Sequence, residues 1–469
     1  MPVPVLLATD ALFFTLFLLL LVFVAIARRR EHLRAPWRAV ARSRLAVAAT
    51  VVLGSYGVIG LLDSLHFHPP LDVAAHRPGQ SHSTEVLSLF DVLVGPLRTQ
   101  KEKTYSAPLA THLYTKESVE GPEGVTRVHP RLRHGGAHLS DPERDWAGDV
   151  ASRVGKGLAL AALIWSVILG LAAWRRGRRT REPVPRAALG LLRGEGPQPS
   201  HILFLTLAAV LSIGCVTAWL AAGYHVLGTD KVGQDVLYQA LKSIRTGLVI
   251  GTLTTLVMLP AAVLLGVMAG YFRGWVDDLI QYLYTTLSSI PGVLLIAAAI
   301  LMMQVYVANH EEAFASITER ADLRLLFLCV ILGVTSWTSL CRLLRGEALK
   351  LRELDYVQAA QAFGVGHFTV LRRHVLPNVL HIVLITVVLD FSALVLAEAV
   401  LSYVNIGVDP TTESWGNMIN GARLELAREP VVWWSLAAAL GFMFLLVLAA
   451  NLLADVVRDA LDPRLRAAR

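Results

Sequence analysis

Nine apolar runs dominate the chain and alternate with polar or arginine-rich stretches. Each run is close to or longer than the roughly 20 residues that an α-helix needs to cross the hydrocarbon core of a bilayer. The pattern therefore predicts an all-α polytopic membrane protein. The predicted spans are residues 5–27, 45–62, 154–174, 202–222, 246–271, 279–306, 323–344, 380–401 and 432–454.

Two of the later runs contain a proline at which the helix is expected to bend or break. Pro260 lies inside the run 246–271 and predicts a kink that neighbouring helices relieve. In the run 279–306, Pro291 and Gly292 predict a break, and the backbone groups that it frees must face protein or a water-filled cavity. We interpret Pro291 and Gly292 as part of a pathway wall; a packing kink is the alternative.

Residues 355–378 form a polar and basic island between two hydrophobic runs. Asp355 is expected to cap a first short helix, and Gly364 to end it. An apolar stripe at helical spacing consists of Tyr356, Ala359, Ala360 and Phe363. A second short helix, 367–375, is expected to close at Leu376-Pro377. Because isolated helices shorter than about 12 residues are marginal in water, the pair needs a surface to pack on, and a partner protein is the expected one.

The composition excludes a soluble globule. Of the 469 residues 54% are hydrophobic, and the mean hydropathy is +0.54. The net charge of +7 comes mostly from arginines beside the ends of apolar runs, which indicates membrane orientation and not nucleic-acid binding. Residues 28–44 and 175–193 carry seven arginines each and read as cytoplasmic loops. We therefore expect a multi-pass protein of the inner (plasma) membrane, with its N-terminus outside and its C-terminus in the cytoplasm.

The polar segment 63–152 is expected to lie outside the membrane as a His/Pro/Gly-rich insert, partly folded around residues 88–97. It contains eight of the fifteen histidines, including His66, His68, His76, His82, His129, His134 and His138. A metal site is one interpretation, but no HExxH motif is present, so we favour a solvated insert and predict no metal. The three cysteines, Cys215, Cys329 and Cys341, offer no disulfide framework and no zinc site. Because the insert lies across the membrane from Gly364, we expect it to be dispensable for coupling.

The island 355–378 resembles the cytoplasmic coupling loop of ABC importer permeases. The family pattern is Glu-Ala-Ala, three residues, Gly, nine residues, Ile, one residue and Leu-Pro. The matching positions here are Ala359, Ala360, Gly364, Leu376 and Pro377. Gln358 replaces the Glu, and His374 replaces the Ile, as is frequent in the dipeptide/oligopeptide subgroup. The resemblance implies that Gln358 and the five matching residues couple the chain to an ATPase.

A second stretch, 228–235, resembles the GTDxxGRD signature of the same subgroup, with Gln234 in place of Arg. Its matching residues are Gly228, Thr229, Asp230, Gly233 and Asp235. We interpret it as a glycine turn in which Asp230 caps a helix at about 232–244 that lies along the membrane surface. Catalysis by the two aspartates is the alternative.

Three more stretches resemble the subgroup in the same order. Residues 397–402 resemble Ala-Glu-Ala-x-Leu-Ser, residues 458–464 resemble the C-terminal tail, and an SWGNM loop contains Trp415, Gly416 and Asn417. Asp390 and Glu398 are the only acids well inside a core span. Because ionisable residues are costly in a membrane, both are candidates for the pathway, with interhelical hydrogen bonding as the alternative.

The resemblance implies a type I ABC importer transmembrane domain of six core helices at 201–469, with the coupling loop at 355–378. Three extra spans precede it: two in residues 1–62, then the insert 63–152, then a third span with a basic linker at 153–200. The implied partners, besides membrane lipid, are a second homologous permease, cytoplasmic ABC ATPases and an extracytoplasmic solute-binding protein, in an importer whose cargo is expected to be peptides.

The chain has no phosphate-binding loop, since Gly155-Lys156 is followed by Gly157. We therefore expect no catalytic residue and no bound cofactor in this chain, with ATP used by the partner ATPases. Closure of the ATPases would move the coupling helices and switch the spans between inward and outward openings. The competing interpretations are a membrane receptor or anchor that acts through the insert, and a metal-dependent membrane enzyme that uses the insert histidines.

Overall fold

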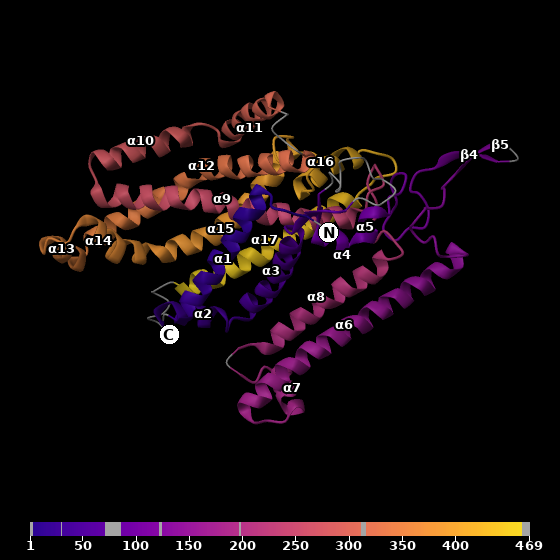
Figure 1. Ribbon diagram of the computed structural model, residues 1–469, viewed down its shortest axis with the longest axis horizontal. Helices are drawn as coiled ribbons and strands as arrows, with labels where there is room; N and C mark the ends of the chain where they lie inside the picture. Colours follow the sequence, from indigo (N-terminus) through magenta and orange to yellow (C-terminus); the bar gives the residue numbers. More distant parts are fainter. Residues whose placement is uncertain are drawn as a thin grey trace. The chain divides into compact units, whose positions relative to one another are not determined.

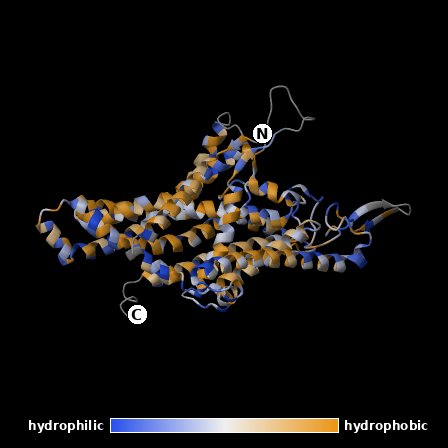
Figure 2. Ribbon diagram, turned by 60° about the horizontal axis from the view of Figure 1, so that its bottom comes forward, coloured by the Kyte–Doolittle hydropathy of each residue, from blue (hydrophilic) through white to orange (hydrophobic). Residues whose placement is uncertain are grey.

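The computed structural model describes residues 3–29, 31–70, 86–121, 124–196, 198–310 and 316–461, and it is mostly helical (Figure 1). Within these residues, nine helices are long and apolar enough to cross a membrane, as predicted. Figure 2 shows hydrophobic residues along the long helices and hydrophilic ones in many of the connections. The nine are Ala8–Ile26, Arg44–Asp63, Pro142–Thr180, Ser200–Ala221, Val236–Phe272, Gly292–Asn309, Ile317–Arg352, His367–Tyr403 and Trp434–Leu461.

The chain divides into two compact units that interleave along the sequence. Unit 1 consists of Met1–Val5, Trp37–Thr246 and Glu413–Val456, and unit 2 of Leu6–Pro36, Gly247–Thr412 and Val457–Arg469. Each unit is described by itself. The helices that lie mainly in unit 1 are α3 (Arg44–Asp63), α4 (Leu89–Leu93), α5 (Gly95–Thr99), α6 (Pro142–Thr180), α7 (Val184–Arg193), α8 (Ser200–Ala221), α16 (Trp415–Glu425) and α17 (Trp434–Leu461).

Two small antiparallel sheets lie in unit 1. Strand β2 (His66–His68) pairs with β1 (Val3–Val5) on one side and with β3 (Leu87–Ser88) on the other. Strands β4 (Glu117–Gly121) and β5 (Gly124–Val128) form a hairpin. The expected helical character at 88–97 is confirmed by α4 and α5, because Ser88 caps α4 through a capping box with Asp91.

Helices α6 and α8 run side by side, and α7 folds back at their shared end (Figure 1). Asp141 begins α6 by accepting a hydrogen bond from the Glu143 N–H, at 3.2 Å. At Gly157 the two backbones meet, because a Cβ there would lie 2.6 Å from the Val216 Cα. Helix α3 packs against α8.

Unit 2 is built around two long helices. The C-terminal part of α9 (Val236–Phe272) packs closely on α12 (Ile317–Arg352), because a Cβ at Gly270 would lie 2.5 Å from the Arg345 carbonyl oxygen. Helix α1 (Ala8–Arg29) also contacts α12, where the Thr9 N–H donates to Asp322 at 3.1 Å. The remaining helices of unit 2 are α2 (Glu31–Val40), α10 (Trp275–Ser289), α11 (Gly292–Asn309), α13 (Asp355–Ala362), α14 (His367–Val370) and α15 (Leu376–Tyr403).

The prediction of a separate surface helix at 232–244 is wrong. These residues lead directly into α9, which runs for 37 residues and contains Pro260. The polar side chains that read as a solvent face have partners in unit 1: Lys242 Nζ lies 3.0 Å from Asp63 and 2.7 Å from Asp91. The break predicted at Pro291 is confirmed, because α10 ends at Ser289 and Pro291 caps α11.

The second coupling helix was expected to close at Leu376-Pro377, and this prediction is also wrong. Helix α14 continues through a π-helical turn, η3 (Leu371–Val375), into α15 without a break. Pro377 lies in the first turn of α15, where a missing N–H is tolerated. In a regular α-helix, a proline ring clashes with the carbonyl four residues before it. The π-helical turn η3, immediately before Pro377, changes the spacing of these carbonyls and so relieves the clash.

Candidate coupling site

The first coupling helix, α13, ends in a glycine with a left-handed backbone. Gly364 has φ +75°, the Val365 N–H donates to the Ala360 carbonyl at 3.0 Å, and the Gly364 N–H donates to the Gln361 carbonyl at 2.9 Å. This pair of bonds is the Schellman motif, which favours glycine at that position. The expected end at Gly364 is confirmed. The expected cap is not: Leu354 occupies the N-cap without a side-chain bond, and Asp355 is already inside the helix.

One side of helix α13 packs on the rest of unit 2, and the other side is exposed. Val357 is fully buried together with Val370 and Val375, in a core that includes residues of α9, α10, α12 and α15. Of the predicted apolar stripe, Ala360 packs on this core. The rest of the stripe, Tyr356, Ala359 and Phe363, is exposed, and Phe363 is 88% exposed. The predicted stripe is therefore divided: Ala360 packs inward, and Phe363 at the end of the helix faces outward.

Polar contacts fasten this loop to the end of α9. The Tyr271 hydroxyl accepts a hydrogen bond from Gln361 Nε2 at 3.0 Å and lies 3.0 Å from His367 Nδ1. Arg352 Nη1 donates to the Tyr271 carbonyl at 2.6 Å. Gln358 Nε2, at the position where the family pattern has Glu, donates to the Glu353 carbonyl at 3.3 Å. Loop and helix end are therefore held as one piece.

Helix α10 is tied to the same region by a two-pronged ion pair. Arg345 Nε and Nη2 donate to the two carboxylate oxygens of Asp277, at 2.6 and 2.8 Å. The hydrogen bonds from Arg345 hold the pKa of Asp277 below its usual range. Arginine is suited to this geometry because its planar fork matches a carboxylate.

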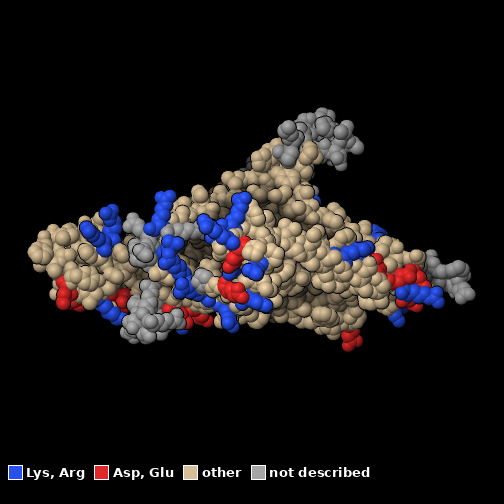
Figure 3. Space-filling view, turned by 90° about the horizontal axis from the view of Figure 1, so that it is seen from below, with Lys and Arg blue, Asp and Glu red and all other residues tan. Residues whose placement is uncertain are grey.

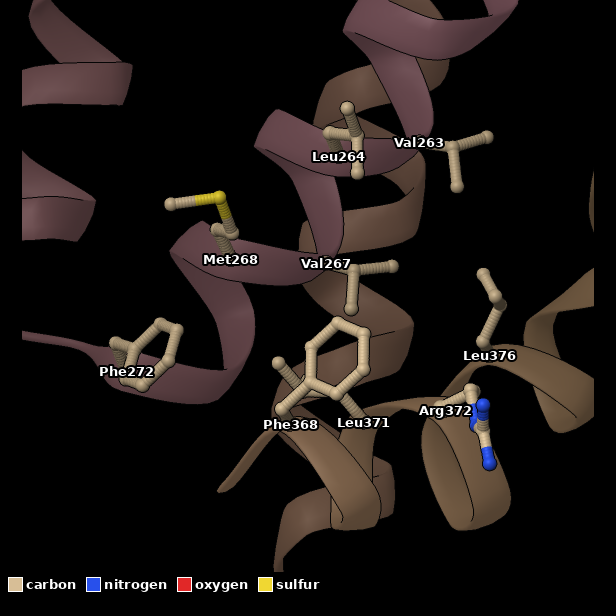
Figure 4. A pocket seen from close by; sticks show the side chains of 9 residues that line it. All are labelled: Val263, Leu264, Val267, Met268, Phe272, Phe368, Leu371, Arg372 and Leu376. Carbon is tan, nitrogen blue, oxygen red and sulfur yellow. The ribbon is translucent and has the colours of Figure 1, made fainter. Parts of the chain in front are cut away.

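An apolar groove of about 490 Å³ separates the second coupling helix from α9 (Figure 4). The wall contributed by α14, η3 and α15 contains Phe368, Leu371, Arg372 and Leu376, and α9 contributes Val263, Leu264, Val267, Met268 and Phe272. Arg372 is the one charged residue among these nine. The groove borders the second coupling helix on this side, while Leu371 and the buried Val370 and Val375 pack on the core of unit 2.

The candidate pathway residues have different surroundings. Pro291 and Gly292 are exposed, with open space around Gly292. Asp390 is half-buried and makes no hydrogen bond or ion pair within the described residues. Glu398 is buried and accepts a hydrogen bond from Ser402 Oγ at 2.7 Å. Ser402 lies on the same helix α15, so this bond is not the interhelical bond given as the alternative, and the pathway role stays a prediction for both Asp390 and Glu398.

The loop 228–235 in unit 1 is a glycine turn, as predicted, and the insert packs directly on it. Gly228 and Gly233 have φ of +74° and +73°, and a Cβ on Gly233 would lie 1.9 Å from the Glu102 carbonyl oxygen. Thr229 Oγ1 donates to the Thr104 carbonyl at 2.9 Å. The Asp230 carboxylate binds the Val232 and Gln234 N–H groups inside the turn.

The expectation that Asp230 caps the following helix is wrong, because Asp235 has that role. Asp235 Oδ1 accepts hydrogen bonds from the N–H groups of Leu237 and Tyr238, at 2.8 and 3.1 Å. The capping residue lies directly before the first helical residue, and α9 begins at Val236. Both aspartates therefore have turn or cap roles, and their geometry gives no support to the catalytic alternative.

A buried charge cluster joins the insert to this loop. His225 Nδ1 lies 2.7 Å from Asp235 Oδ2, and His225 Nε2 lies 3.4 Å from Glu102 Oε1. Burial alone would lower the pKa of His225, but the contacts with the two carboxylates raise it to about 9. Burial alone would raise the pKa of Glu102, but bonds from His225 and from three backbone N–H groups lower it to about 2. At neutral pH His225 is therefore the positive group of this cluster.

The SWGNM loop is also structural in this unit. Ser414 caps α16 by accepting from the Asn417 N–H at 3.0 Å. Trp415 is buried and donates from Nε1 to the Ala240 carbonyl at 3.0 Å. Gly416 is buried beside it. The loop thereby attaches α16 to the start of α9.

The insert histidines have ordinary partners where the structure describes them. His138 Nε2 lies 2.8 Å from Asp149, and His129 Nδ1 lies 3.0 Å from the Leu113 carbonyl. Within the described ranges, no group of three or more His, Cys, Asp or Glu side chains is arranged to hold a metal. His76 and His82 lie outside those ranges. The absence of metal remains a prediction.

Residues 262–467 match the family described as "Binding-protein-dependent transport system inner membrane component". A glutathione transport system permease protein of Pectobacterium atrosepticum is 32% identical to this chain over 244 residues. The aligned region covers 52% of this chain and 73% of the relative. The chain belongs to this family. It is also 31% identical over 245 residues to an oligopeptide transport system permease protein of Mycobacterium tuberculosis, and the aligned region covers 78% of that protein. A dipeptide transport system permease protein of Bacillus subtilis is 28% identical over 242 residues, 69% of its length.

The permease is therefore a multi-pass inner-membrane subunit of a binding-protein-dependent ABC importer, with the all-α type I fold that was predicted. The prediction that it is not an enzyme is confirmed by these relatives, and the receptor or anchor interpretation is set aside. The family match begins at residue 262, so the insert and helices α6 to α8 lie outside it.

Some residues that organise the permease were not predicted. Glu102 and His225 stand 123 positions apart and carry no local motif. Tyr271 lies at the end of an apolar run and reads as a membrane-interface aromatic. The one available signal was the Tyr-His pair before the glycine turn, Tyr224-His225, because a histidine beside a signature loop invites a search for an acidic partner.

Proposed function

We propose that the permease forms one half of the translocation pathway of an ATP-driven peptide importer and is driven through residues 355–378. The names of the relatives, which transport glutathione, oligopeptides or dipeptides, support a peptide cargo. The proposed partners are a second permease, cytoplasmic ABC ATPases that use the ATP, and an extracytoplasmic solute-binding protein. The N-terminus lies outside and the C-terminus in the cytoplasm, in keeping with the arginine clusters at 28–44 and 175–193.

One observation carries the proposal: the coupling loop is continuous with a transmembrane helix. The exposed surface of α13 leads through the glycine turn at Gly364 into α14, η3 and α15. Helix α15 carries both Asp390 and Glu398. A force applied at Phe363 therefore passes through the glycine turn and then along the continuous helix from α14 to α15 toward Asp390 and Glu398, which suits transmission by a rigid element.

The proposal is tested at Gly364, which needs a left-handed backbone but has open space around it. Gly364→Val places a β-branched side chain at φ +75°, whereas Gly364→Asn keeps a residue that tolerates this conformation. The penalty for Val is about 1–2 kcal/mol or more, which lowers the ratio of intact to disrupted loop by about five- to thirtyfold. We expect Gly364→Val to lose ATP-driven uptake and stimulated ATP hydrolysis together, while Gly364→Asn keeps most of both.

Ala359→Arg provides an independent variant. Ala359 is exposed, so the change costs little within the permease and acts where a partner docks. Its complex should show normal membrane insertion and lost ATPase stimulation, and Gln358→Glu, which restores the family residue, should be tolerated. The readouts are uptake and ATPase rate in vesicles that contain all subunits. Parental uptake by both Gly364→Val and Ala359→Arg would show that this loop is not the coupling element.

A further inference from the structure

The end of α6 carries a stripe of arginines on one side of the helix, around a hollow of about 470 Å³. The hollow is lined by Ala172, Arg175, Arg176, Arg179 and Thr180. These residues are spaced three to four apart and so share one helix face. Arg175 and Arg179 are exposed, and within the described residues neither forms an ion pair with an acid. Two cations without anionic partners therefore point at one hollow.

The hollow lies where the apolar part of α6 ends, which places it at the membrane boundary. Trp174 is exposed there, with the Arg178 guanidinium 4.1 Å from its ring centre. Tryptophan and arginine at the end of a span are typical of the membrane–water interface. Lipid headgroups are the groups that meet the protein at this depth.

Helix α7 gives an independent indication that lipid is adjacent. Its buried residues, Ala187 and Gly190, belong to the side that packs next to α6. Three of its large apolar residues, Val184, Leu189 and Leu192, are 40–46% exposed. A short helix with exposed apolar residues and basic ends, directly after a span, is typical of helices that lie in the membrane interface.

Two acids, Glu182 and Glu195, lie near the hollow. Arg176 Nη2 donates to the Glu195 carbonyl at 2.6 Å, so Arg176 is positioned by a backbone oxygen. Glu182 accepts a hydrogen bond from the Thr180 hydroxyl at 3.2 Å. Figure 3 shows Lys and Arg side chains, with some Asp and Glu side chains among them, on the face that is seen from below. Among the described residues, Arg175 and Arg179 are therefore the two cations of the hollow that have no acidic partner, and Ala172 is its apolar residue.

We propose that the hollow at Arg175, Arg176 and Arg179 binds the headgroup phosphate of an anionic phospholipid, whose acyl chains lie along the apolar part of α6. Membrane-boundary arginines attract anionic lipid in general, by about fivefold for each residue, or ~1 kcal/mol. The hollow differs from that general attraction because three arginines converge on one space. It is a built site, separate from the coupling loop.

The test compares two triple variants of the full-length permease that lose the same charge. The first changes the three arginines of the hollow to Gln. The second, a matched control, changes Arg181, Arg186 and Arg193 to Gln, in the same basic segment but outside the hollow. Each is equilibrated with equal amounts of phosphatidylglycerol and phosphatidylcholine, and retained lipid is counted by native mass spectrometry. We expect the hollow variant to lose at least tenfold more of its preference for phosphatidylglycerol than the control, which loses only the general attraction of three arginines.

A third variant, with Lys at the three hollow positions, keeps the charge and should retain most of the preference, so the test stands if the Gln variant folds poorly. An equal loss in the hollow variant and the control would mean diffuse attraction and overturn the site, as would no loss in either. Displacement of the lipid by soluble glycerol phosphate would assign the hollow to free phosphates and overturn the lipid assignment.

Discussion

Replacing His225 by Gln tests whether a buried charge cluster holds the insert on the permease. The His225 side chain is 3% exposed and lies between Asp235 and Glu102. Glutamine keeps a polar side chain but removes the positive charge, which leaves two carboxylates facing each other in a buried site. Removing one member of a buried ion pair commonly costs about 3–5 kcal/mol, because the remaining charge is uncompensated.

The raised pKa of His225 gives a second measure of how much the charge cluster stabilises the fold. It rises from 6.5 to about 9 in the folded protein. At about 1.4 kcal/mol for each pKa unit, the protonated imidazole contributes on the order of 3 kcal/mol to stability. Because the folded state binds this proton more tightly, the contribution is complete below pH 6.5 and is lost as the pH rises through 9. The lowered pKa of Glu102 reflects partly the same contact with His225 and partly three backbone N–H groups, so it is not an independent contribution.

Amide hydrogen exchange reports directly on the contact between the insert and the loop 228–235. The Glu102 N–H donates to the Gly233 carbonyl at 2.9 Å, and the Thr229 N–H donates to the Ser106 carbonyl at 3.1 Å, so both amides connect the insert to the loop. After correction for intrinsic rates, we expect their protection to fall about a hundredfold in His225→Gln at pH 6.5, and in the parent protein between pH 6.5 and 10. His112→Gln, at an exposed histidine, is the matched control. Parental protection of both amides in His225→Gln would refute the reasoning.

Two further predictions concern the outer loop and the topology. Burial raises the pKa of Glu413 to about 7, and Gln234 Nε2 lies 3.2 Å from its carboxylate, so Gln234→Arg should lower that pKa. A carboxyl group with a raised pKa destabilises the folded protein increasingly as the pH rises from 4.5 to 7. The Gln234→Arg variant should therefore gain up to about 3 kcal/mol in free energy of unfolding at pH 8 and little at pH 4. Equal shifts in melting temperature at the two pH values would contradict this prediction. In a cysteine-free permease, an impermeant reagent added outside should label Ser118→Cys and not Gln198→Cys, and the opposite order would contradict the proposed orientation.

The transmembrane spans and the end of the first coupling helix could be predicted because their causes are local. An apolar run of sufficient length has few alternatives in a membrane. A glycine after a short helix supplies the left-handed residue of a Schellman turn by itself, as Gly364 does. Neither inference requires knowledge of a distant residue.

The errors arose where distant residues decide the local structure. Lys242 reads as the polar face of a surface helix until Asp63 and Asp91 are known to meet it, 179 and 151 positions away in the sequence. Pro377 reads as a helix end because proline usually is one, and the π-helical turn before it has no signature of its own. The N-cap of α9 was assigned to Asp230 and not to Asp235, which lies five positions later, because either carboxylate can accept hydrogen bonds from backbone N–H groups.

The expectation that the insert is dispensable for coupling is still a prediction, but deleting the insert would not test it cleanly. A deletion of residues 73–145 removes Asp91 and Glu102, and so leaves Lys242 and His225 without those partners. It also uncovers Gly233, whose backbone the insert contacts closely. Lys242 keeps Asp63 and His225 keeps Asp235, but each loses its second carboxylate, and this loss destabilises unit 1 whatever the insert does for transport. A lost ATPase association would therefore report damaged packing, and only variants that keep the buried charge pairs can separate the function of the insert from its place in the fold.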